Sequence, residues 1–417
     1  MPDVNQRPST TAERAVGEPA VLKTYRQRTR RANTIYAGVL AIIVIVTFVA
    51  VKLAYAHGEL NKVSFRTAPA AAPMPAGTPG STLRLAWHTA DNAAGGTPFQ
   101  DGVVVTWAGH TVNGRDARTG EVRWHYTRAD ETICSVVQQD SSTIAIYRRK
   151  GNCDEVTGFV TATGEPKFYR TLYDNGNTQS ASLSNVVMTV GSNFVHEFDN
   201  AGGLDRWNWT APAGCTVTRA LAGTLGTLIA LDCGSTHQLV LRDLIQDITR
   251  FSVETPTALV PIAAAAFVGA LDPVTGTLYR YSQDKGVAKA VTRLPGAPAT
   301  GYPRAAAALS TTDSAQQPVE FALAGKLVAF FGDGSVRWTA AATSAPNLIA
   351  DAFVAVADGA AQVRLHRVTG GQVQLTTTIS PALQSPGSQS HLFAVGSGLG
   401  FTGGGGSGSD SGVSVYA

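Results

Sequence analysis

The sequence predicts an all-β fold, a seven-bladed β-propeller with eight blades as the alternative, preceded by one N-terminal transmembrane helix. Three observations predict it. One uncharged apolar run lies near the start of the 417 residues, and short β-rich runs separated by turn residues follow from Thr82 onward. A turn motif also recurs about every 42 residues, which is typical of propellers built from four-stranded blades.

The apolar run spans residues 32–51 and contains eleven Ile, Val, Leu or Phe residues and no charge. About 20 helical residues cross a hydrocarbon core of about 30 Å, and these eleven contribute about −3 to −7 kcal/mol on an insertion scale. We therefore expect a signal anchor over residues 32–56, preceded by a basic, disordered tail over residues 1–31.

The charges on either side of this run predict its orientation. Residues 1–31 carry seven basic and three acidic side chains, a net charge of +4, and the residues after Lys52 carry 25 basic and 27 acidic ones, a net charge of −2. Basic residues stay on the cytoplasmic side, so the C-terminal part is expected outside the cytoplasm. Because Ala54-Tyr55-Ala56 has the form of a signal-peptidase site, cleavage after Ala56 is the alternative; the long apolar run and the charge of Lys52 favour an uncleaved anchor in the cell membrane.

Residues 57–81 are predicted to be a stalk. Their four prolines are Pro69, Pro73, Pro75 and Pro79. A segment of Pro, Ala, Gly and Thr buries no core and favours an extended, polyproline-type spacer. The remaining residues, 82–417, are assigned to the propeller ectodomain, in which the Gly/Ser stretch 403–412 is expected to be a loop.

The four cysteines form two pairs, Cys134 with Cys153 and Cys215 with Cys233, separated by 18 and 17 residues. The first cysteine of each pair opens a strand-like run and the second follows the next such run, so the open end of a hairpin would bring the sulfur atoms together. Outside the cytoplasm this pattern predicts two disulfides, each worth about 3 kcal/mol. Free buried thiols are the alternative. Zinc is not indicated, because the sequence has no CxxC cluster.

A turn motif recurs along the ectodomain. In its best copy, Asp116 lies four residues before the turn glycine Gly120, and Trp124 lies four residues after it. The same frame returns as Asp199, Gly203 and Trp207, as Asp243, Asp247 and Phe251, and as Gly334 with Trp338. In such a hairpin the Asp accepts backbone N–H groups and the glycine supplies a positive φ. The aromatic ring is expected to pack against the next blade.

The turn positions number seven and lie at residues 120, 164, 203, 247, 276, 334 and 370, which are 44, 39, 44, 29, 58 and 36 residues apart. The intervals of 29 and 58 average 43.5, which indicates one turn placed out of register. Seven turns favour seven blades, whereas about 335 residues divided by about 42 give eight. The strand at residues 82–87 is expected to complete the last blade, since an open ring leaves two strand edges unpaired.

The unit formed by Asp116, Thr119-Gly120 and Trp124 resembles the tryptophan-docking repeat of the PQQ-like, quinoprotein-type β-propellers. The resemblance covers residues 100–375 and weakens along the chain, where Arg280 and Gln374 stand in place of the aromatic. The overall layout also resembles actinobacterial single-span membrane proteins with an extracytoplasmic PQQ-like propeller. An excess of Arg over Lys, 25 to 8, agrees with a GC-rich genome.

The resemblance raises the question of a quinone cofactor, and the residues do not support one. Enzymes of that family carry adjacent cysteines and acidic Ca²⁺ ligands, and this sequence has no adjacent cysteines and no matching acidic cluster. The eight histidines form no HxH or HExxH motif, and no GxSxG motif occurs. We therefore expect no catalytic, cofactor-binding or metal site. The near-neutral ectodomain does not favour nucleic acid as a partner.

These observations favour a membrane-anchored, extracytoplasmic scaffold that binds proteins of the cell envelope and is not an enzyme. The alternative is a sensor that binds a small ligand or a glycan in the propeller channel, and a remote alternative is a degenerate PQQ-dependent dehydrogenase. Fold alone does not choose among these functions, because propellers host all three.

Overall fold

The computed structural model divides into two compact units, Met1–Lys62 and Val63–Ala417. The residues that the structure describes are 20–57, 62–75, 77–96, 98–172, 179–183, 185–294, 309–312, 318–323, 326–342, 344, 347–349, 353–358, 361–382, 391–403 and 412–417.

The first unit contains the helix α1, Ala20–His57. Its stretch Asn33–Lys52 is long and apolar enough to cross a membrane, a property that signal sequences share. The expectation of a disordered tail over residues 1–31 is wrong from Ala20 onward. The reason is composition: the Leu, Lys, Gln and Arg residues of 20–31 are strong helix formers that extend the helix of the apolar run.

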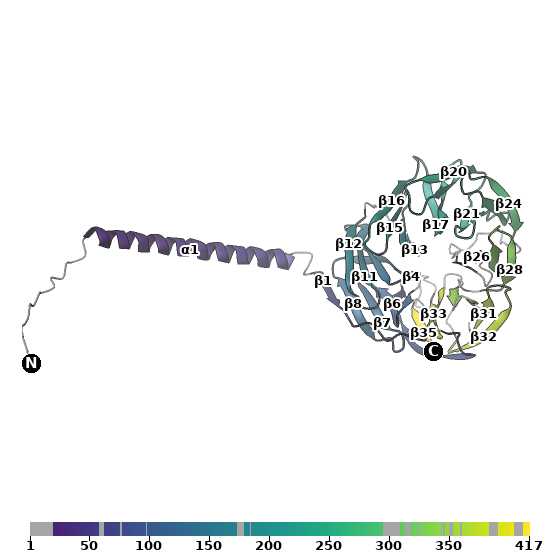
Figure 1. Cartoon of the computed structure of the whole chain (residues 1–417), viewed down its shortest axis with the longest axis horizontal. Coiled ribbons are helices and arrows are strands. Elements are labelled where there is room, and N and C mark those ends of the chain that lie inside the picture. Colours follow the sequence, from purple (N-terminus) through teal and green to yellow (C-terminus); the bar gives the residue numbers. More distant parts are fainter. Residues whose placement is uncertain are drawn as a thin grey trace, which may run out of the picture. The chain divides into compact units, whose positions relative to one another are not determined.

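The second unit is a ring of small, mostly antiparallel sheets (Figure 1). Its described strands form six separate sheets and one eight-stranded sheet in which β2 joins two more, so they make six plus two, or eight, blades. The predicted all-β propeller is confirmed, with the larger of the two blade counts that the sequence allowed.

The strands of each blade are given from the innermost to the outermost. Blade 1 contains β6 Val103–Ala108, β7 Thr111–Asp116 and β8 Val122–Arg128. Blade 2 contains β9 Thr132–Gln139, β10 Ser142–Arg149, β11 Asn152–Val160 and β12 Pro166–Thr171. Blade 3 contains β13 Gln179–Leu183, β14 Val186–Val190, β15 Phe194–Asp199 and β16 Asp205–Thr210. Blade 4 contains β17 Thr216–Gly223, β18 Gly226–Asp232, β19 His237–Arg242 and β20 Thr249–Thr255. Blade 5 contains β21 Val260–Ala263, β22 Val268–Leu271, β23 Thr277–Tyr281 and β24 Ala288–Arg293. Blade 6 contains β25 Leu309–Thr312, β26 Pro318–Leu323, β27 Leu327–Phe331 and β28 Val336–Ala340. Blade 7 contains β29 Asn347–Ile349, β30 Phe353–Ala357, β31 Gln362–Arg367 and β32 Val373–Ser380. Blade 8 contains β33 His391–Val395, β34 Gly398–Thr402, β35 Val413–Tyr416 and β2 Thr82–Thr89.

Four short strands extend the first two blades. They are β1 Val63–Arg66 on the outer edge of β8, β3 Asn92–Ala93 and β5 Phe99–Gln100 beside β6, and β4 Gly95–Gly96 beside β9.

The hairpins of a blade alternate between two faces of the ring. Consecutive strands of an antiparallel sheet run in opposite directions, so the first and third hairpins of each blade lie at one edge and the second lies at the other. We call the face with the first and third hairpins the turn face. The opposite face, which carries the second hairpins and the connections between blades, is called the loop face.

The ring is closed by the N-terminal strand. The start of β2 pairs in parallel with β32, with Thr82 opposite Thr378. The rest of β2 pairs antiparallel with β35, from Leu85 opposite Tyr416 to Thr89 opposite Val413. The prediction that the N-terminal strand completes the last blade is therefore confirmed, and the edge of β35 that would otherwise be open is paired.

This closure explains why seven turn motifs accompany eight blades. In blade 8 the third and outer strands come from the two ends of the chain, so no hairpin joins them. The motif placed at Gly276 lies between β22 and β23 on the loop face, and the third hairpin of blade 5 has its positive-φ glycine at Gly286 instead. In blade 7 that glycine is Gly371 rather than residue 370. The corrected positions 247, 286, 334 and 371 are 39, 48 and 37 residues apart.

The segment predicted to be a stalk belongs to the second unit. Strand β1 pairs with β8 along the outer edge of blade 1, from Val63 opposite Arg128 to Arg66 opposite His125. Residues 67–75 and 77–81, which we call the strap, then contact blades 1, 2, 7 and 8 before β2 begins. The expectation of a free spacer is wrong for this part of the chain.

Aromatic rings on the outer strands hold neighbouring blades together. The ring of Trp124 in blade 1 lies so close to Gly164 of blade 2 that a Cβ on this glycine would meet the ring at 2.6 Å. Nε1 of Trp124 donates a hydrogen bond of 2.9 Å to the carbonyl oxygen of Thr161. Trp87 of β2 contacts Gly120 in the same way at the seam between blades 8 and 1. Equivalent pairs are Phe168 with Gly203, Phe251 with Gly286 and Trp338 with Gly371.

The aspartates of the repeat shape the third hairpins. Oδ1 of Asp116 accepts hydrogen bonds from the backbone N–H groups of Arg118 and Thr119 at 2.9 and 3.3 Å. Asp199 and Asp243 accept equivalent bonds in blades 3 and 4. The turn glycines Gly120 and Gly203 have φ values of 75° and 71°, which a side chain would strain.

Candidate interaction surface

Exposed apolar side chains lie on the turn face of five consecutive blades, the last being Val373 of blade 7 at 46%. In blades 3 and 4, Leu204 is 72% exposed and Ile245 and Ile248 are 64% and 51% exposed. In blades 5 and 6, Val287 and Phe331 are 63% and 40% exposed. We call the five residues of blades 3 to 6 the apolar arc. They lie in or next to the third hairpins, where turn chemistry favours Gly, Asn, Asp and Ser. Their shared position on one face makes this part of the ring a candidate interaction surface.

The third hairpin of blade 4 departs from the repeat. Asp247 occupies the position of the turn glycine and is not among the residues with positive φ, so the turn closes differently, with Ile248 N–H bonded to the carbonyl oxygen of Gln246. Trp207 of blade 3 is 3% exposed, and the guanidinium group of Arg242 in blade 4 lies 5.1 Å from its ring. Within the described part of the chain its Nε1 has no hydrogen-bond partner. Among the described residues, blade 4 therefore lacks the docking bond of the repeat, and its third hairpin carries two exposed isoleucines, Ile245 and Ile248.

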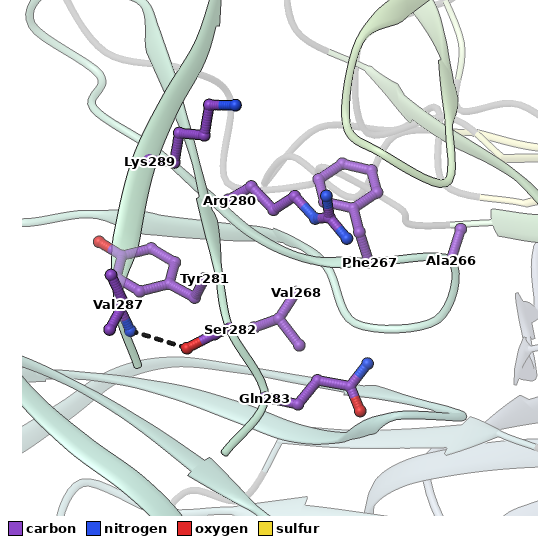
Figure 2. Close-up of a pocket in the computed structure, with 9 residues that line it drawn as sticks. All are labelled: Ala266, Phe267, Val268, Arg280, Tyr281, Ser282, Gln283, Val287 and Lys289. Atoms are coloured by element: carbon purple, nitrogen blue, oxygen red, sulfur yellow. Dashed lines mark hydrogen bonds between the residues drawn. The ribbon is translucent and has the colours of Figure 1, made fainter. Parts of the chain in front are cut away.

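Blade 5 lacks the docking aromatic. Ala290 occupies its position, and Phe267 from the first hairpin packs in its place, 3.3 Å from a Cβ on Gly334 and 5.7 Å from the ring of Phe330. A pocket of about 320 Å³ opens beside Phe267 (Figure 2). Its lining residues are Ala266, Phe267, Val268, Arg280, Tyr281, Ser282, Gln283, Val287 and Lys289. The pocket thus adjoins the apolar arc at Val287 and carries two cationic side chains.

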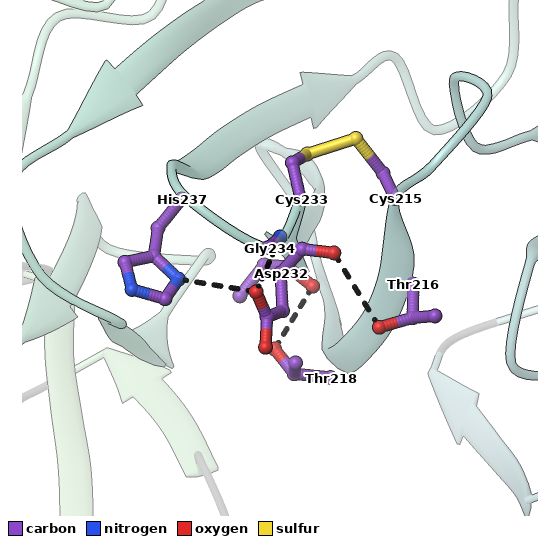
Figure 3. Close-up of a disulfide and its surroundings, with 8 residues drawn as sticks. Cys215, Thr216, Thr218, Asp232, Cys233, Gly234 and His237 are labelled. Atoms are coloured by element: carbon purple, nitrogen blue, oxygen red, sulfur yellow. Dashed lines mark hydrogen bonds and ion pairs between the residues drawn. A yellow bond between two sulfur atoms is a disulfide. The ribbon is translucent and has the colours of Figure 1, made fainter.

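Two disulfides tie loops of the opposite face. The predicted bridges Cys134–Cys153 and Cys215–Cys233 are both present, with Cα atoms 6.0 and 4.0 Å apart, and no cysteine is free. Each joins the beginning of an inner strand to the second hairpin of the same blade. Beside the bridge of blade 4, Oδ1 of Asp232 accepts a bond from Gly234 N–H (Figure 3). The bridges fix the loop face in blades 2 and 4.

Two fully buried carboxyl groups lie at blade contacts. Burial raises the pKa of Glu197 to about 8, and Thr227 Oγ1 of the next blade donates a hydrogen bond to it. Burial also raises the pKa of Glu320 to about 7, and this side chain accepts N–H groups of Ala264 and Ala266 at 3.2 and 2.8 Å. Because both groups are enclosed between blades, their contacts stabilise the ring rather than face a ligand.

Over the described ranges no three His, Cys, Asp or Glu side chains converge where they could hold a metal ion. Arg280, which the sequence places at an aromatic position, lies in β23 and lines the blade 5 pocket.

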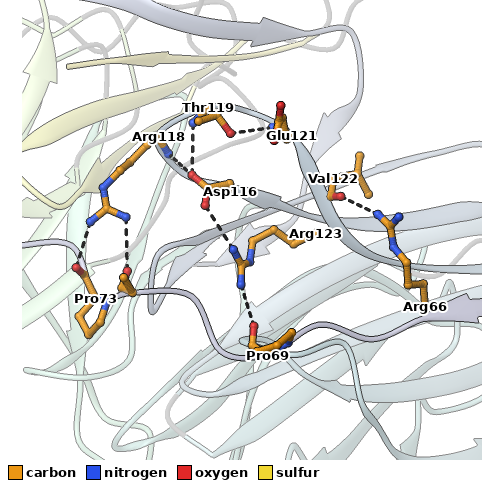
Figure 4. Close-up of polar contacts among 10 residues, drawn as sticks. Arg66, Pro69, Pro73, Asp116, Arg118, Thr119, Glu121, Val122 and Arg123 are labelled. Atoms are coloured by element: carbon orange, nitrogen blue, oxygen red, sulfur yellow. Dashed lines mark hydrogen bonds and ion pairs between the residues drawn. The ribbon is translucent and has the colours of Figure 1, made fainter.

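Arginines of blade 1 hold the strap by its backbone carbonyl groups (Figure 4). Nη2 of Arg118 donates to the carbonyl oxygen of Pro73 at 3.1 Å, and Nη2 of Arg123 donates to that of Pro69 at 2.7 Å. Asp116 positions both arginines, since it accepts the Arg118 backbone N–H and lies 3.4 Å from Nη1 of Arg123. The strap is therefore docked on an acid–guanidinium pair of the turn motif.

Other strap contacts bridge the seam of the ring. Ala68 N–H donates to the carbonyl oxygen of Thr163 in blade 2 at 3.0 Å, and Ala71 is buried in the core of blades 1 and 2. Gly396 in the first hairpin of blade 8 packs against Met74. At the end of the strap, Thr377 of blade 7 donates a hydrogen bond to Gly80. One extended segment thus connects the first two and the last two blades.

The strap-binding position of Arg123 is repeated around the ring. The residue three positions after the turn position is basic in blades 1 to 6: Arg123, Lys167, Arg206, Arg250, Lys289 and Arg337. In blade 4, Nε of Arg250 bonds to Oδ2 of Asp243 at 3.0 Å, which repeats the acid–guanidinium pair of blade 1. This basic period is visible in the sequence at a fixed distance from each turn and was missed. Three residues of the apolar arc, Leu204, Ile248 and Val287, likewise stand at a fixed place, directly after the turn position.

Comparisons with known proteins give the fold. No protein-family model and no curated protein sequence matches the chain. The crystal structure of the computationally designed Ika8 protein is 13% identical with a TM-score of 0.55, and the match covers 81% of this chain and 100% of that one. BamB from Moraxella catarrhalis (14% identity, TM-score 0.48, 80% and 99% covered) and quinohemoprotein alcohol dehydrogenase from Comamonas testosteroni (12%, 0.48, 81% and 76%) are also similar. At these identities the likeness shows the fold alone, a β-propeller.

Proposed function

We propose that this chain is a membrane-anchored, extracytoplasmic β-propeller that binds proteins of the cell envelope as a scaffold and catalyses no reaction. The apolar arc is the observation that carries the proposal. Its five side chains stand on a ring braced by docked aromatics and two disulfides. A rigid surface with exposed apolar groups suits recognition of another protein, since little conformational entropy is lost on binding.

The location follows from the first unit and the cysteines. Asn33–Lys52 can cross a membrane, and the net charge of +4 before the apolar run favours a cytoplasmic N-terminus. Disulfides persist in oxidising compartments, so the two bridges support an ectodomain outside the cytoplasm.

Crosslinking in intact cells tests this function. A membrane-impermeant amine-reactive crosslinker reaches exposed lysines such as Lys167 and Lys289 only if the propeller is outside the cytoplasm. We expect the full-length chain to crosslink repeatedly to a small, reproducible set of envelope proteins. Absence of any reproducible crosslinked protein, or a measured turnover of the purified chain, would contradict the proposal.

A second candidate, a sensor of a small ligand or glycan, is favoured by the blade 5 pocket. Arg280 and Lys289 would attract an anionic group, and Tyr281 and Gln283 offer hydrogen bonds. This pocket lies on the turn face, whereas the sequence suggested the channel. A thermal-shift screen with acidic sugars and small carboxylates tests it: a hit must disappear in Arg280→Ala but persist in Arg84→Ala, an exposed arginine on β2. The remote quinoprotein alternative requires a bound chromophore after PQQ and Ca²⁺ are added.

A further inference from the structure

We propose that the apolar arc docks an extended, proline- and alanine-rich segment of a partner protein, in the way that the strap occupies blades 1, 2 and 8. The inference rests on the proposed scaffold function and gives the partner's chemistry. Three features of the molecule support it: the binding mode of the strap, the repetition of its donors, and the exposed apolar groups beside them.

The strap shows what the turn face binds. Its small apolar side chains pack against blades, as the burial of Ala71 shows, and its carbonyl groups accept bonds from Arg118 and Arg123. Proline offers a carbonyl group without an N–H group and is already extended, so such a segment matches a surface that mainly donates hydrogen bonds. The fifteen residues 67–81 suffice to contact blades 2, 1 and 8 and to reach blade 7.

The donor position of Arg123 continues in blades where the described strap residues make no contact. Arg206, Arg250 and Lys289 stand at the repeat position of Arg123 in blades 3, 4 and 5. Arg250 is paired with Asp243 as Arg123 is with Asp116, and both arginines keep further N–H groups beyond that pair. A second extended segment therefore meets the counterpart of Arg123 in each of these blades, whereas the position of Arg118 is occupied by Ala201, Ile245 and Asp284.

The apolar arc adds contacts on this path. Ile245 and Ile248 flank the acid–guanidinium pair of blade 4, and Val287 lies at the rim of the blade 5 pocket. Small apolar side chains of a partner segment would cover these groups. Because the surface continues an established strap interface, we assign it to a segment of strap-like chemistry rather than to a lipid surface or a second copy.

A peptide-binding experiment tests the inference with the full-length chain in detergent. The probe is a fluorescein-labelled synthetic peptide with the sequence of residues 67–81, titrated by fluorescence anisotropy up to about 1 mM protein, the weak end of specific binding. We expect saturable binding that weakens at least tenfold in the double variant Ile245→Glu/Ile248→Glu. The matched control is Val274→Glu, since Val274 is 71% exposed but lies in a second hairpin on the loop face.

The outcomes separate this inference from the scaffold function. Binding that is unaffected by the blade 4 variant but lost in Arg118→Ala would mean that the peptide displaces the chain's own strap, and overturns the inference. Absence of saturable binding, or concentration-dependent dimerisation that the blade 4 variant abolishes, also overturns it. If the variant leaves the crosslinked envelope proteins unchanged in cells, the scaffold function stands and the arc is not its site.

Discussion

The docking hydrogen bond of the propeller repeat can be measured by comparing two tryptophans. Trp124 and Trp207 occupy the same repeat position in blades 1 and 3 and are 0% and 3% exposed. Nε1 of Trp124 donates to Thr161 at 2.9 Å, whereas Nε1 of Trp207 has no partner within the described residues. Phe is a natural occupant of this position at Phe168 and Phe251, so Trp→Phe preserves the ring contact.

Loss of the indole N–H should therefore destabilise the fold in the Trp124 variant and stabilise it in the Trp207 variant. Each leaves a similar small cavity, which costs about 1–2 kcal/mol. Trp124→Phe additionally leaves the buried carbonyl of Thr161 unpaired and costs about 1–3 kcal/mol more, whereas Trp207→Phe removes an unpaired buried N–H and recovers about 1–3 kcal/mol. We expect the free energy of unfolding of the Trp207 variant to exceed that of the Trp124 variant by at least about 2 kcal/mol.

Equilibrium urea unfolding of the full-length chain, followed by far-ultraviolet circular dichroism, measures this difference. The slopes of the transitions must agree, so that the midpoints report stability. Equal destabilisation by the two substitutions would show that the indole N–H contributes nothing to blade docking, and greater destabilisation by Trp207→Phe would reverse the reasoning.

Three further predictions concern the buried acid, the strap and the anchor. Burial raises the pKa of Glu197 from its ordinary 4.5 to about 8, so between these pH values the folded chain holds a proton that the unfolded chain loses. The melting temperature should therefore fall as the pH rises from 4.5 to 8. Glu197→Gln should flatten this dependence of the melting temperature on pH, and the exposed control Glu121→Gln should not. Parallel profiles would contradict this. The double variant Arg118→Ala/Arg123→Ala loses the guanidinium bonds to the strap, so elastase should cut the strap several-fold faster; an unchanged rate would show that these bonds do not hold it. Mass spectrometry of the membrane-extracted protein should give the 43.5 kDa of all 417 residues, and loss of residues 1–56 would instead show cleavage after Ala56.

The propeller was predictable because its turns carry local chemistry. Asp116 and Gly120 shape one hairpin through bonds within five residues, so their spacing is legible in the sequence. The same chemistry also misplaced one turn. Asp272 accepts backbone N–H groups of Val274 and Thr275 in a second hairpin, and the sequence alone does not distinguish this hairpin from the third one at Gly286.

The docking of the strap was not predictable, because it depends on contacts between distant residues. Proline content correctly indicates an extended backbone for this segment. However, Arg118, whose guanidinium group donates a hydrogen bond to the carbonyl oxygen of Pro73, lies 45 residues further along the chain. Ile245 lies two residues before the turn position, and Arg118 and Ala201 at the same position of blades 1 and 3 are exposed as well, so its exposure follows from its place in the hairpin.

The irregular turn of blade 4 gives its disulfide a role that the bridge of blade 2 does not have. Cys134–Cys153 and Cys215–Cys233 close loops of 19 and 18 residues, so the chain-entropy model assigns each about 3 kcal/mol of global stability. Blade 2 also has its docking bond from Trp124 to Thr161, whereas Trp207 makes no such bond to blade 4 among the described residues. Local opening of blade 4 should therefore depend more on its bridge than local opening of blade 2 does. The variant Cys215→Ser/Cys233→Ser should lose amide hydrogen-exchange protection in β17–β20 well before global unfolding, whereas Cys134→Ser/Cys153→Ser should keep β9–β12 protected. Equal local loss in both blades would show that the missing docking bond does not weaken blade 4.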